Sequence, residues 1–210
     1  MRITIVYDNT ASRKDLQADW GFSCLIEEKD TPKILFDTGA NGKILLSNME
    51  KLRIDPLSIE EIFISHLHFD HIGGLDEFLR INPKVTRIYL PSSMGLENEV
   101  VLKEPAKIHE NIFSTGELEG IEQSMGVITE KGIILIVGCS HPYMGNILNT
   151  ARQFGKPYGI IGGMHGFSEF ELFKDLTLIC PTHCTQHKAE LKRLYPQKYV
   201  EGGVGKIIEI

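Results

Sequence analysis

Ten short runs rich in isoleucine, valine and other apolar residues recur along this chain of 210 residues. Many of them are bounded by Gly, Pro, Asp or Asn, which is typical of β-strands. We therefore predict strands at Arg2–Tyr7, Phe22–Glu27, Lys33–Phe36, Glu61–Ile64, Arg87–Leu90, Met125–Thr129, Ile133–Val137, Tyr158–Ile161, Leu178–Cys180 and Val204–Ile210.

Helical patterns lie between some of these strands. Asn41–Arg53 carries apolar residues on one helical face, and Leu75–Ile81, Gly145–Phe154 and Thr185–Tyr195 read as further helices. Asp55 followed by Pro56 has the form of a helix N-cap. Strands that dominate at first, with helices between them later, favour a layered α/β fold with mixed sheets over a regular βαβ array.

Composition narrows the class of protein. No linker divides the chain, so we predict one domain over residues 1–210, with Pro91 to Lys107 as an irregular excursion within it. The net charge of −6 and the lack of a Lys/Arg cluster argue against double-stranded nucleic acid as a partner. No signal peptide and no apolar run near the roughly 20 residues of a spanning helix is present, so we predict a cytoplasmic protein without a membrane partner. Four irregularly spaced cysteines do not form a disulfide framework.

The segment His66-Leu67-His68-Phe69-Asp70-His71 carries four candidate metal ligands within six residues. Imidazole and carboxylate groups are good ligands for zinc and related ions. His66 and His68 share a face in an extended segment, because alternate side chains point the same way. Asp70 and His71 fall where the chain turns towards a helix, so they can address a second point nearby. The segment therefore predicts the start of two adjacent metal sites.

Three later histidines stand just after predicted strands, where sheet proteins commonly place functional groups. They are His141, His165 and His183. His109 and His187 lack this setting, and we expect both on the surface. We interpret Cys139 and Cys184 as small core residues beside the ligands rather than as ligands themselves.

These motifs, together with Leu35-Phe36-Asp37-Thr38-Gly39, resemble the metallo-β-lactamase superfamily. The resemblance implies an αββα sandwich of two mixed sheets with helices on the outer faces and metals at one edge. It implies one metal held by His66, His68 and His141. It implies a second metal held by Asp70, His71 and His183, with Asp37 accepting a hydrogen bond from a ligand imidazole. His165 stands where many members carry a bridging aspartate, which leaves it as either an extra ligand or a substrate-facing residue.

Within the superfamily, the chain is similar to the group of dihydropterin-ribofuranosylaminobenzene 5′-phosphate synthases. The similar segments are Asp8–Thr10, Asp19–Ser23, Gly138–Pro142, Gly162–His165 and His183–Thr185. The chain departs from the group's pattern at Tyr143 and Gln186, where the group has glycine, and in the short interval between His71 and His141.

The resemblance implies a metal-dependent hydrolase with a small molecule as substrate, and a phosphorylated molecule such as a pterin phosphate is a candidate. Two divalent ions, zinc by preference with iron or manganese as alternatives, activate a hydroxide for attack on a phosphoester, ester or related bond, and Asp70 orients the nucleophile. Asn9, Tyr143 and His165 are candidates to face the substrate. Two alternatives stay open: a di-iron redox protein, which His68 argues against because such members carry Glu there, and a non-catalytic metal-binding regulatory protein. Oligomeric state stays open as well.

Overall fold

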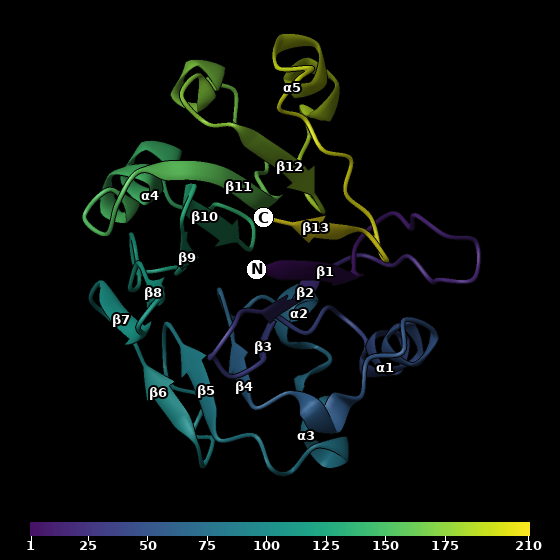
Figure 1. Cartoon of the computed structure of the whole chain (residues 1–210). Helices are drawn as coiled ribbons and strands as arrows, with labels where there is room; N and C mark the ends of the chain where they lie inside the picture. Colours follow the sequence, from purple (N-terminus) through teal and green to yellow (C-terminus); the bar gives the residue numbers. More distant parts are fainter.

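In the computed structural model, which describes residues 1–210, two β-sheets pack face to face and helices cover their outer faces (Figure 1). The first sheet contains, in spatial order, β13 (Ile207–Glu209), β1 (Arg2–Tyr7), β2 (Ser23–Glu27), β3 (Ile34–Phe36), β4 (Glu61–Phe63), β5 (Arg87–Leu90) and β6 (Glu99–Val101). The second contains β12 (Leu178–Thr182), β11 (Pro157–Gly163), β10 (Gly132–Val137), β9 (Met125–Thr129), β8 (Ile112–Ser114) and β7 (Ala106–His109).

Both sheets are mixed. In the first, β13, β1, β2 and β3 pair antiparallel, whereas β3, β4, β5 and β6 pair parallel. In the second, β10, β11 and β12 pair parallel, and β7 to β10 pair antiparallel. Neighbouring parallel strands end at the same edge of their sheet, which brings the loops that follow them together.

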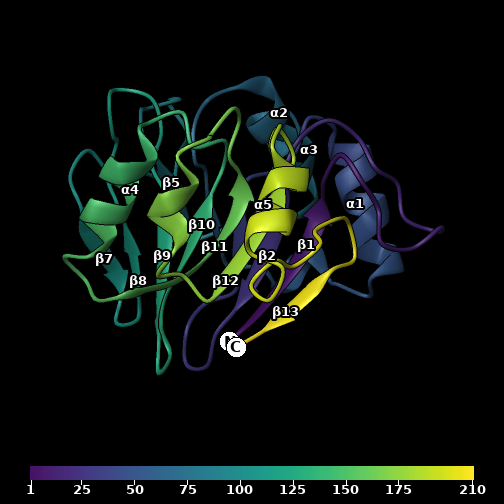
Figure 2. The same ribbon diagram turned by 90° about the horizontal axis from the view of Figure 1, so that it is seen from above.

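The helices form the two outer layers. The helices α1 (Gly42–Lys51) and α3 (Leu75–Ile81) pack on the first sheet, and α4 (Met144–Ala151) and α5 (Lys188–Leu194) pack on the second. Figure 2 places the short helix α2 (Phe69–Ile72) at the end of the sandwich opposite the two termini. Short 3₁₀ helices span Pro56–Ser58 and Phe170–Phe173. The predicted αββα sandwich of two mixed sheets is confirmed.

The apolar core lies in three layers, and β10 shows why its sequence is apolar throughout. Ile134 and Ile136 pack between the two sheets with Phe36 and Phe63. The intervening residues of β10, beginning with Ile133, pack under α4. Because alternate side chains of a strand face opposite sides, a strand covered on both faces reads as a continuous apolar run. No helix combines the length and apolar character that crossing a membrane requires.

The segment predicted as an irregular excursion was interpreted wrongly. It contains β6 and leads into β7, and neither these strands nor β8 were predicted. The strands β6 and β7 lie at sheet edges and are only partly buried, so their charged and polar residues hide the apolar pattern of a strand.

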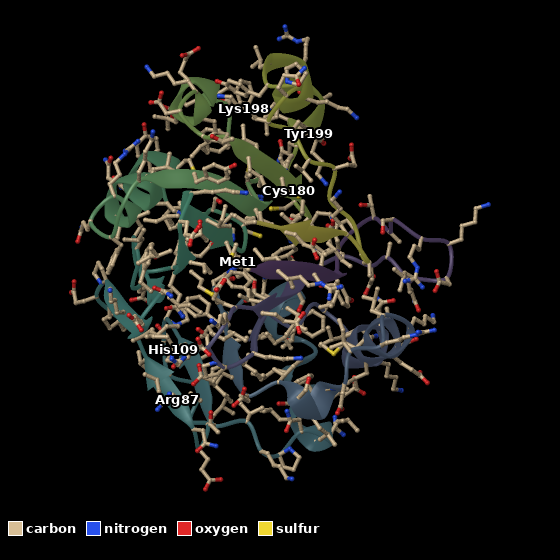
Figure 3. The ribbon with its side chains drawn as sticks, in the orientation of Figure 1. Met1, Arg87, His109, Cys180, Lys198 and Tyr199 are labelled. Carbon is tan, nitrogen blue, oxygen red and sulfur yellow. The ribbon has the colours of Figure 1, made fainter.

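The interpretation of His109 as a surface residue was also wrong. Its side chain is 17% exposed, and its Nε2 lies 2.7 Å from Oε2 of the buried Glu61. Arg87 pairs with the same carboxylate at 2.9 Å. Figure 3 shows Arg87 and His109 close together on neighbouring parts of the fold. His109 therefore contacts a buried carboxylate that is 48 residues away in the sequence, which spacing alone does not reveal.

Candidate metal centre

The residues predicted to hold metals gather at one edge of the sandwich, where several strands end. Asp37 follows β3 and His66 follows β4, while Asp70 and His71 lie in α2. From the second sheet, the loops after β10, β11 and β12 carry the remaining histidines, His141, His165 and His183. The parallel pairing within each sheet is what brings these loops to a common edge.

The first group consists of His66, His68 and His141, whose ligand atoms lie within 4.8 Å of one another. Nε2 of His66 lies 3.1 Å from Nδ1 of His68. Nε2 of His141 lies 3.2 Å from the same Nδ1. His68 is exposed and His141 is half-buried, so this group is open on one side.

The second group consists of Asp70, His71, Cys139 and His183, again with ligand atoms within 4.8 Å of one another. Oδ2 of Asp70 lies 3.1 Å from Nε2 of His183 and 3.8 Å from Nε2 of His71. Nε2 of His71 lies 3.2 Å from Sγ of Cys139. This group is buried apart from Asp70, which is partly exposed.

Neighbouring side chains fix the orientation of three of the rings. Nδ1 of His71 lies 2.7 Å from Asp37 Oδ2, and Nδ1 of His183 lies 2.9 Å from Asn9 Oδ1. Ser65 Oγ donates to Asp37 Oδ2 at 2.8 Å and so accepts from Nδ1 of His66 at 2.9 Å. A proton on each Nδ1 leaves the Nε2 lone pair directed into the site, which is the usual arrangement of metal-binding histidines.

The charges of the site suit a cation. Burial lowers the pKa of His66, and burial also lowers the pKa of His141 to about 4. Burial alone would lower the pKa of His71, but the charges of Asp37, Asp70 and Glu122 raise it. Burial alone would raise the pKa of Asp70, but its hydrogen bond with His183 lowers it. The lowered pKa values favour neutral imidazoles at His66 and His141 and an ionised carboxylate at Asp70, which are the forms that divalent transition metals bind. The residues present therefore fit two such ions.

Glu122 is a supporting residue that the sequence analysis missed. This buried carboxylate accepts the backbone N–H groups of Gly138, Cys139 and Ser140 on Oε1 at 3.0 to 3.1 Å. Its Oε2 accepts the backbone N–H of His141 at 3.0 Å. Four N–H bonds to one carboxylate hold the turn that carries His141. The only signal for this role in the sequence is a glutamate in the loop before β9, which is too general to identify it.

The backbone at the site is strained in places. Asp37, Ser140, His165 and His183 all have positive φ values, at 53°, 58°, 38° and 46°. Non-glycine residues adopt this region rarely, and such residues concentrate at functional sites. Each of the four lies in a loop that follows a strand of the site edge.

The predicted substrate-facing residues lie around the site in different settings. His165 lies beside His141, with ring centroids 4.6 Å apart and ring planes tilted by 46°, and its ligand atom lies within 4.8 Å of those of Cys139 and His141. Tyr143 is exposed, and its hydroxyl donates to Glu169 at 3.0 Å. Asn9 instead contacts the outer nitrogen of His183.

Trp20 and Phe22, two aromatic residues in one segment, differ completely. The Trp20 side chain is 58% exposed, and its indole N–H donates to Asp70 Oδ2 at 2.9 Å. Phe22 is buried between the sheets. Of these two side chains, only Trp20 is accessible at the surface.

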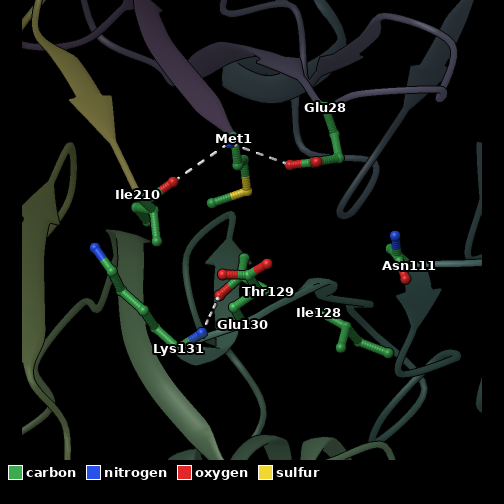
Figure 4. Close-up of a pocket in the computed structure, with 8 residues that line it drawn as sticks. All are labelled: Met1, Glu28, Asn111, Ile128, Thr129, Glu130, Lys131 and Ile210. Atoms are coloured by element: carbon green, nitrogen blue, oxygen red, sulfur yellow. Dashed lines mark hydrogen bonds and ion pairs between the residues drawn. The ribbon is translucent and has the colours of Figure 1, made fainter.

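Two cavities flank the centre. One of about 280 Å³ is lined by His141, Tyr143 and His165, and another of about 250 Å³ is lined by His66, His68 and Ile121. A cavity of about 620 Å³ lies elsewhere, between Glu28, Lys131 and the two chain ends (Figure 4). This cavity contains none of the candidate ligands, so only the two flanking cavities adjoin the candidate metal centre.

Comparison with known proteins agrees with this picture. Residues 21–167 match the sequence model of the metallo-β-lactamase superfamily. The 7,8-dihydropterin-6-methyl-4-(β-D-ribofuranosyl)-aminobenzene-5′-phosphate synthase of Methanocaldococcus jannaschii is 27% identical, over 98% of this chain and 95% of the relative. An uncharacterised protein of the same organism is 32% identical, over 99% of this chain and 100% of the relative. The solved structure of Tm1679, described as a metal-dependent hydrolase of the β-lactamase superfamily, has a TM-score of 0.78 and 26% identity, covering 100% of this chain and 99% of that one.

Proposed function

Because this chain belongs to the metallo-β-lactamase superfamily, we propose that it is a metal-dependent hydrolase acting on a phosphoester, ester or related bond. The observation that carries the proposal is the convergence of two groups of candidate ligands at one edge of the sandwich. The outer nitrogens of His66, His71 and His183 are already engaged by neighbouring side chains, which directs their inner nitrogens to the same space. Packing alone gives no reason for this orientation.

In this proposal His66, His68 and His141 hold one divalent cation. Asp70, His71 and His183 hold the other. Bound there, the two cations supply Lewis-acid activation of a water molecule and stabilise negative charge on the reacting group. Zinc is the first choice of metal because imidazole nitrogens dominate the first group, and iron and manganese are the alternatives.

Side chains of the protein position the attacking water and the substrate and accept a proton. Asp70 is ionised and 21% exposed, so its carboxylate can orient the attacking water and accept its proton. His165 and Tyr143 line the cavity of about 280 Å³ beside His141, where they can hold the part of the substrate that leaves. Asn9 acts by fixing the His183 ring rather than by direct contact.

For the substrate we propose a small phosphorylated molecule with a flat ring, of the pterin type. Three aromatic side chains around the centre are exposed, with Trp20 at 58%, Tyr143 at 47% and Phe69 at 71%. Exposed aromatic faces beside a polar centre suit stacking on a flat ring. The name of the M. jannaschii synthase contains both a dihydropterin and a phosphate. Its alignment with this chain runs over 281 positions, so that relative carries segments that this chain of 210 residues lacks.

The test combines metal content with turnover. Wild-type protein is loaded with zinc, iron or manganese, its metal content is measured by elemental mass spectrometry, and it is assayed on a phosphodiester, a carboxylic ester, a lactone and a pterin phosphate. We expect about two metal ions per chain and turnover of at least one substrate. His68→Ala should lose metal and abolish turnover, because it removes the ligand nearest to both His66 and His141.

His187→Ala is the matched control, because His187 is a histidine outside both groups whose side chain is 37% exposed. It should match the wild type in metal content and turnover. Full metal content and full activity in His68→Ala would overturn the proposal. Two bound metal ions without turnover of any substrate would favour the non-catalytic metal-binding alternative.

A further inference from the structure

Cys139 links the two halves of the centre. Its Sγ belongs to the buried group with Asp70, His71 and His183. It also lies within 4.8 Å of the ligand atoms of His141 and His165 on the open side. Cys139 is only 2% exposed, so its side chain points into the protein and not to solvent.

The turn after β10 fixes this direction. The N–H groups of residues 138–141 converge on Glu122, and Ser140 takes a φ of 58° between Cys139 and His141. The Ser140 hydroxyl donates to the carbonyl of Gly163 at 2.8 Å, which ties the turn to β11. The left-handed residue places the side chains on either side of it in the same pocket. The turn bound by Glu122 therefore holds both Cys139 and His141 at the site.

A purely structural role explains the contacts of Cys139 less well. An S–H group facing Nε2 of His71 at 3.2 Å would make a weak hydrogen bond. Nδ1 of that ring is engaged by Asp37, so Nε2 is the nitrogen that faces the site. Sulfur, nitrogen and the Asp70 oxygen then converge in a buried space, which is the donor set of a transition-metal site. The neighbouring Cys184 lies behind Cys139, with the two sulfurs 3.4 Å apart, and belongs to none of the groups.

We propose that Cys139 is a thiolate ligand of the cation held by Asp70, His71 and His183. This inference rests on the proposed metal-dependent function, and it replaces the interpretation of Cys139 as a small core residue. On binding, the S–H bond breaks, its proton passes to the buffer, and the sulfur donates an electron pair to the cation. A thiolate favours zinc, iron or cobalt over manganese and magnesium at this position.

The test uses cobalt(II) as a spectroscopic probe, with a reductant present to keep Cys139 and Cys184 from oxidising. Wild type, Cys139→Ser and Cys184→Ser are each loaded with cobalt, and metal content and the near-ultraviolet spectrum are recorded. We expect an intense sulfur-to-cobalt charge-transfer band in the wild type. The band should disappear in Cys139→Ser and persist in Cys184→Ser, the matched thiol control. X-ray absorption of the wild type at the cobalt edge should show a sulfur neighbour, and this measurement does not depend on the folding of any variant.

The outcomes separate the inference from the proposed function. A wild type that binds about two cobalt ions with neither the band nor a sulfur neighbour overturns the role of Cys139 and leaves the hydrolase proposal standing. A band that survives in Cys139→Ser and vanishes in Cys184→Ser also overturns it. A wild type that binds no cobalt and no other divalent metal overturns both proposals together.

Discussion

The two groups of candidate ligands differ in how firmly the protein holds them. In the buried group, Asp37 fixes His71 and Asn9 fixes His183. In the open group only His66 has such a partner, while Nδ1 of His68 contacts only other histidines of the group. From this difference we infer that the buried group is organised before a metal arrives, whereas the metal completes the open group. We infer that the buried group anchors the centre and that the open group faces the substrate.

The two groups also differ in the position of the residues that hold their ligand rings. Asp8 and Asn9 follow β1, and Asp8 accepts the backbone N–H of His183 at 2.7 Å across the two sheets. His183 of the buried group is thus held by contacts between the sheets, whereas Asp37 and His71 follow neighbouring strands of the first sheet. The open group sits in loops bordered by cavities on both sides. Variants that remove one supporting residue at a time test whether the two groups differ in this way.

The largest effect is expected from Asp37→Ala. Asp37 is buried and accepts hydrogen bonds from the backbone N–H and the hydroxyl of Ser65, besides its pairing with His71. Removing one partner of a buried charged pair typically costs about 3–5 kcal/mol of stability. We expect a loss of this size by chemical denaturation, together with loss of the metal of the buried group by elemental mass spectrometry.

Glu61→Ala is the control that separates stability from metal binding. Glu61 is an equally buried carboxylate, but its partners are Arg87 and His109, away from the centre. It should lower the stability by a comparable amount and leave metal content unchanged. Equal loss of metal in both variants would mean that metal retention follows global stability rather than the support of His71.

A smaller effect is expected from pH in the metal-free protein. Burial lowers the pKa of His141, in the open group, from 6.5 to about 4. Between these values the unfolded chain binds more protons than the folded protein, so stability should fall as the pH drops from 6.5 towards 4. For His71, in the buried group, burial is outweighed by the charge of Asp37 and the pKa is raised above 6.5. The contribution of His71 is therefore full below pH 6.5 and is lost as the pH rises through its raised pKa.

Thermal unfolding of metal-free protein across this pH range checks both signs. His141→Gln should flatten the acidic limb, and His71→Gln should remove the decline above pH 6.5. The slopes matter here rather than the melting temperatures themselves, since both variants alter packing. An acidic limb that is unchanged in His141→Gln would contradict the contribution of His141 and would leave His66, whose pKa burial also lowers, as the source within the open group.

Parts of the centre could be predicted from sequence because they are local. His66 to His71 form one short segment, and strand ends mark the remaining histidines. Glu122 could not be predicted, because its role arises from four N–H groups that meet it only after the turn beyond β10 has formed. The same holds for His109, whose partner Glu61 is distant in sequence. The sequence favours a core role for Cys139 because small buried cysteines are common in cores, and the proposed ligand role rests on the position of its sulfur, which only the structure shows.

The strands also differ in how well the sequence predicts them. Strands covered on both faces, such as β10, were predicted because burial demands continuous apolar residues. The edge strands β6 and β7 were missed because backbone pairing, rather than side-chain burial, defines them. Residues supported by long-range contacts are therefore the ones that the sequence leaves undetermined.

The smallest effect is expected from Trp20→Phe, which removes one hydrogen bond from the exposed edge of the buried group. The indole N–H donates to Asp70 Oδ2 at 2.9 Å, the same oxygen that lies 3.1 Å from His183 Nε2. A single hydrogen bond contributes about 0.5–1.5 kcal/mol, so metal affinity should fall about 2- to 10-fold in competition with a chromophoric chelator. Tyr143→Phe, which loses a bond to Glu169 and none to a candidate ligand, should leave the affinity unchanged.

Trp20 is the single tryptophan of the chain, so its fluorescence in the wild type reports on the same contact. If the indole keeps its bond to Asp70 when metal binds, the emission should change at the equivalent that fills the buried group and not at the other. An emission change without any loss of affinity in Trp20→Phe would mean that Asp70 turns away from the indole to reach the cation. In that case the edge of the buried group, like the open group, would be completed only by the metal.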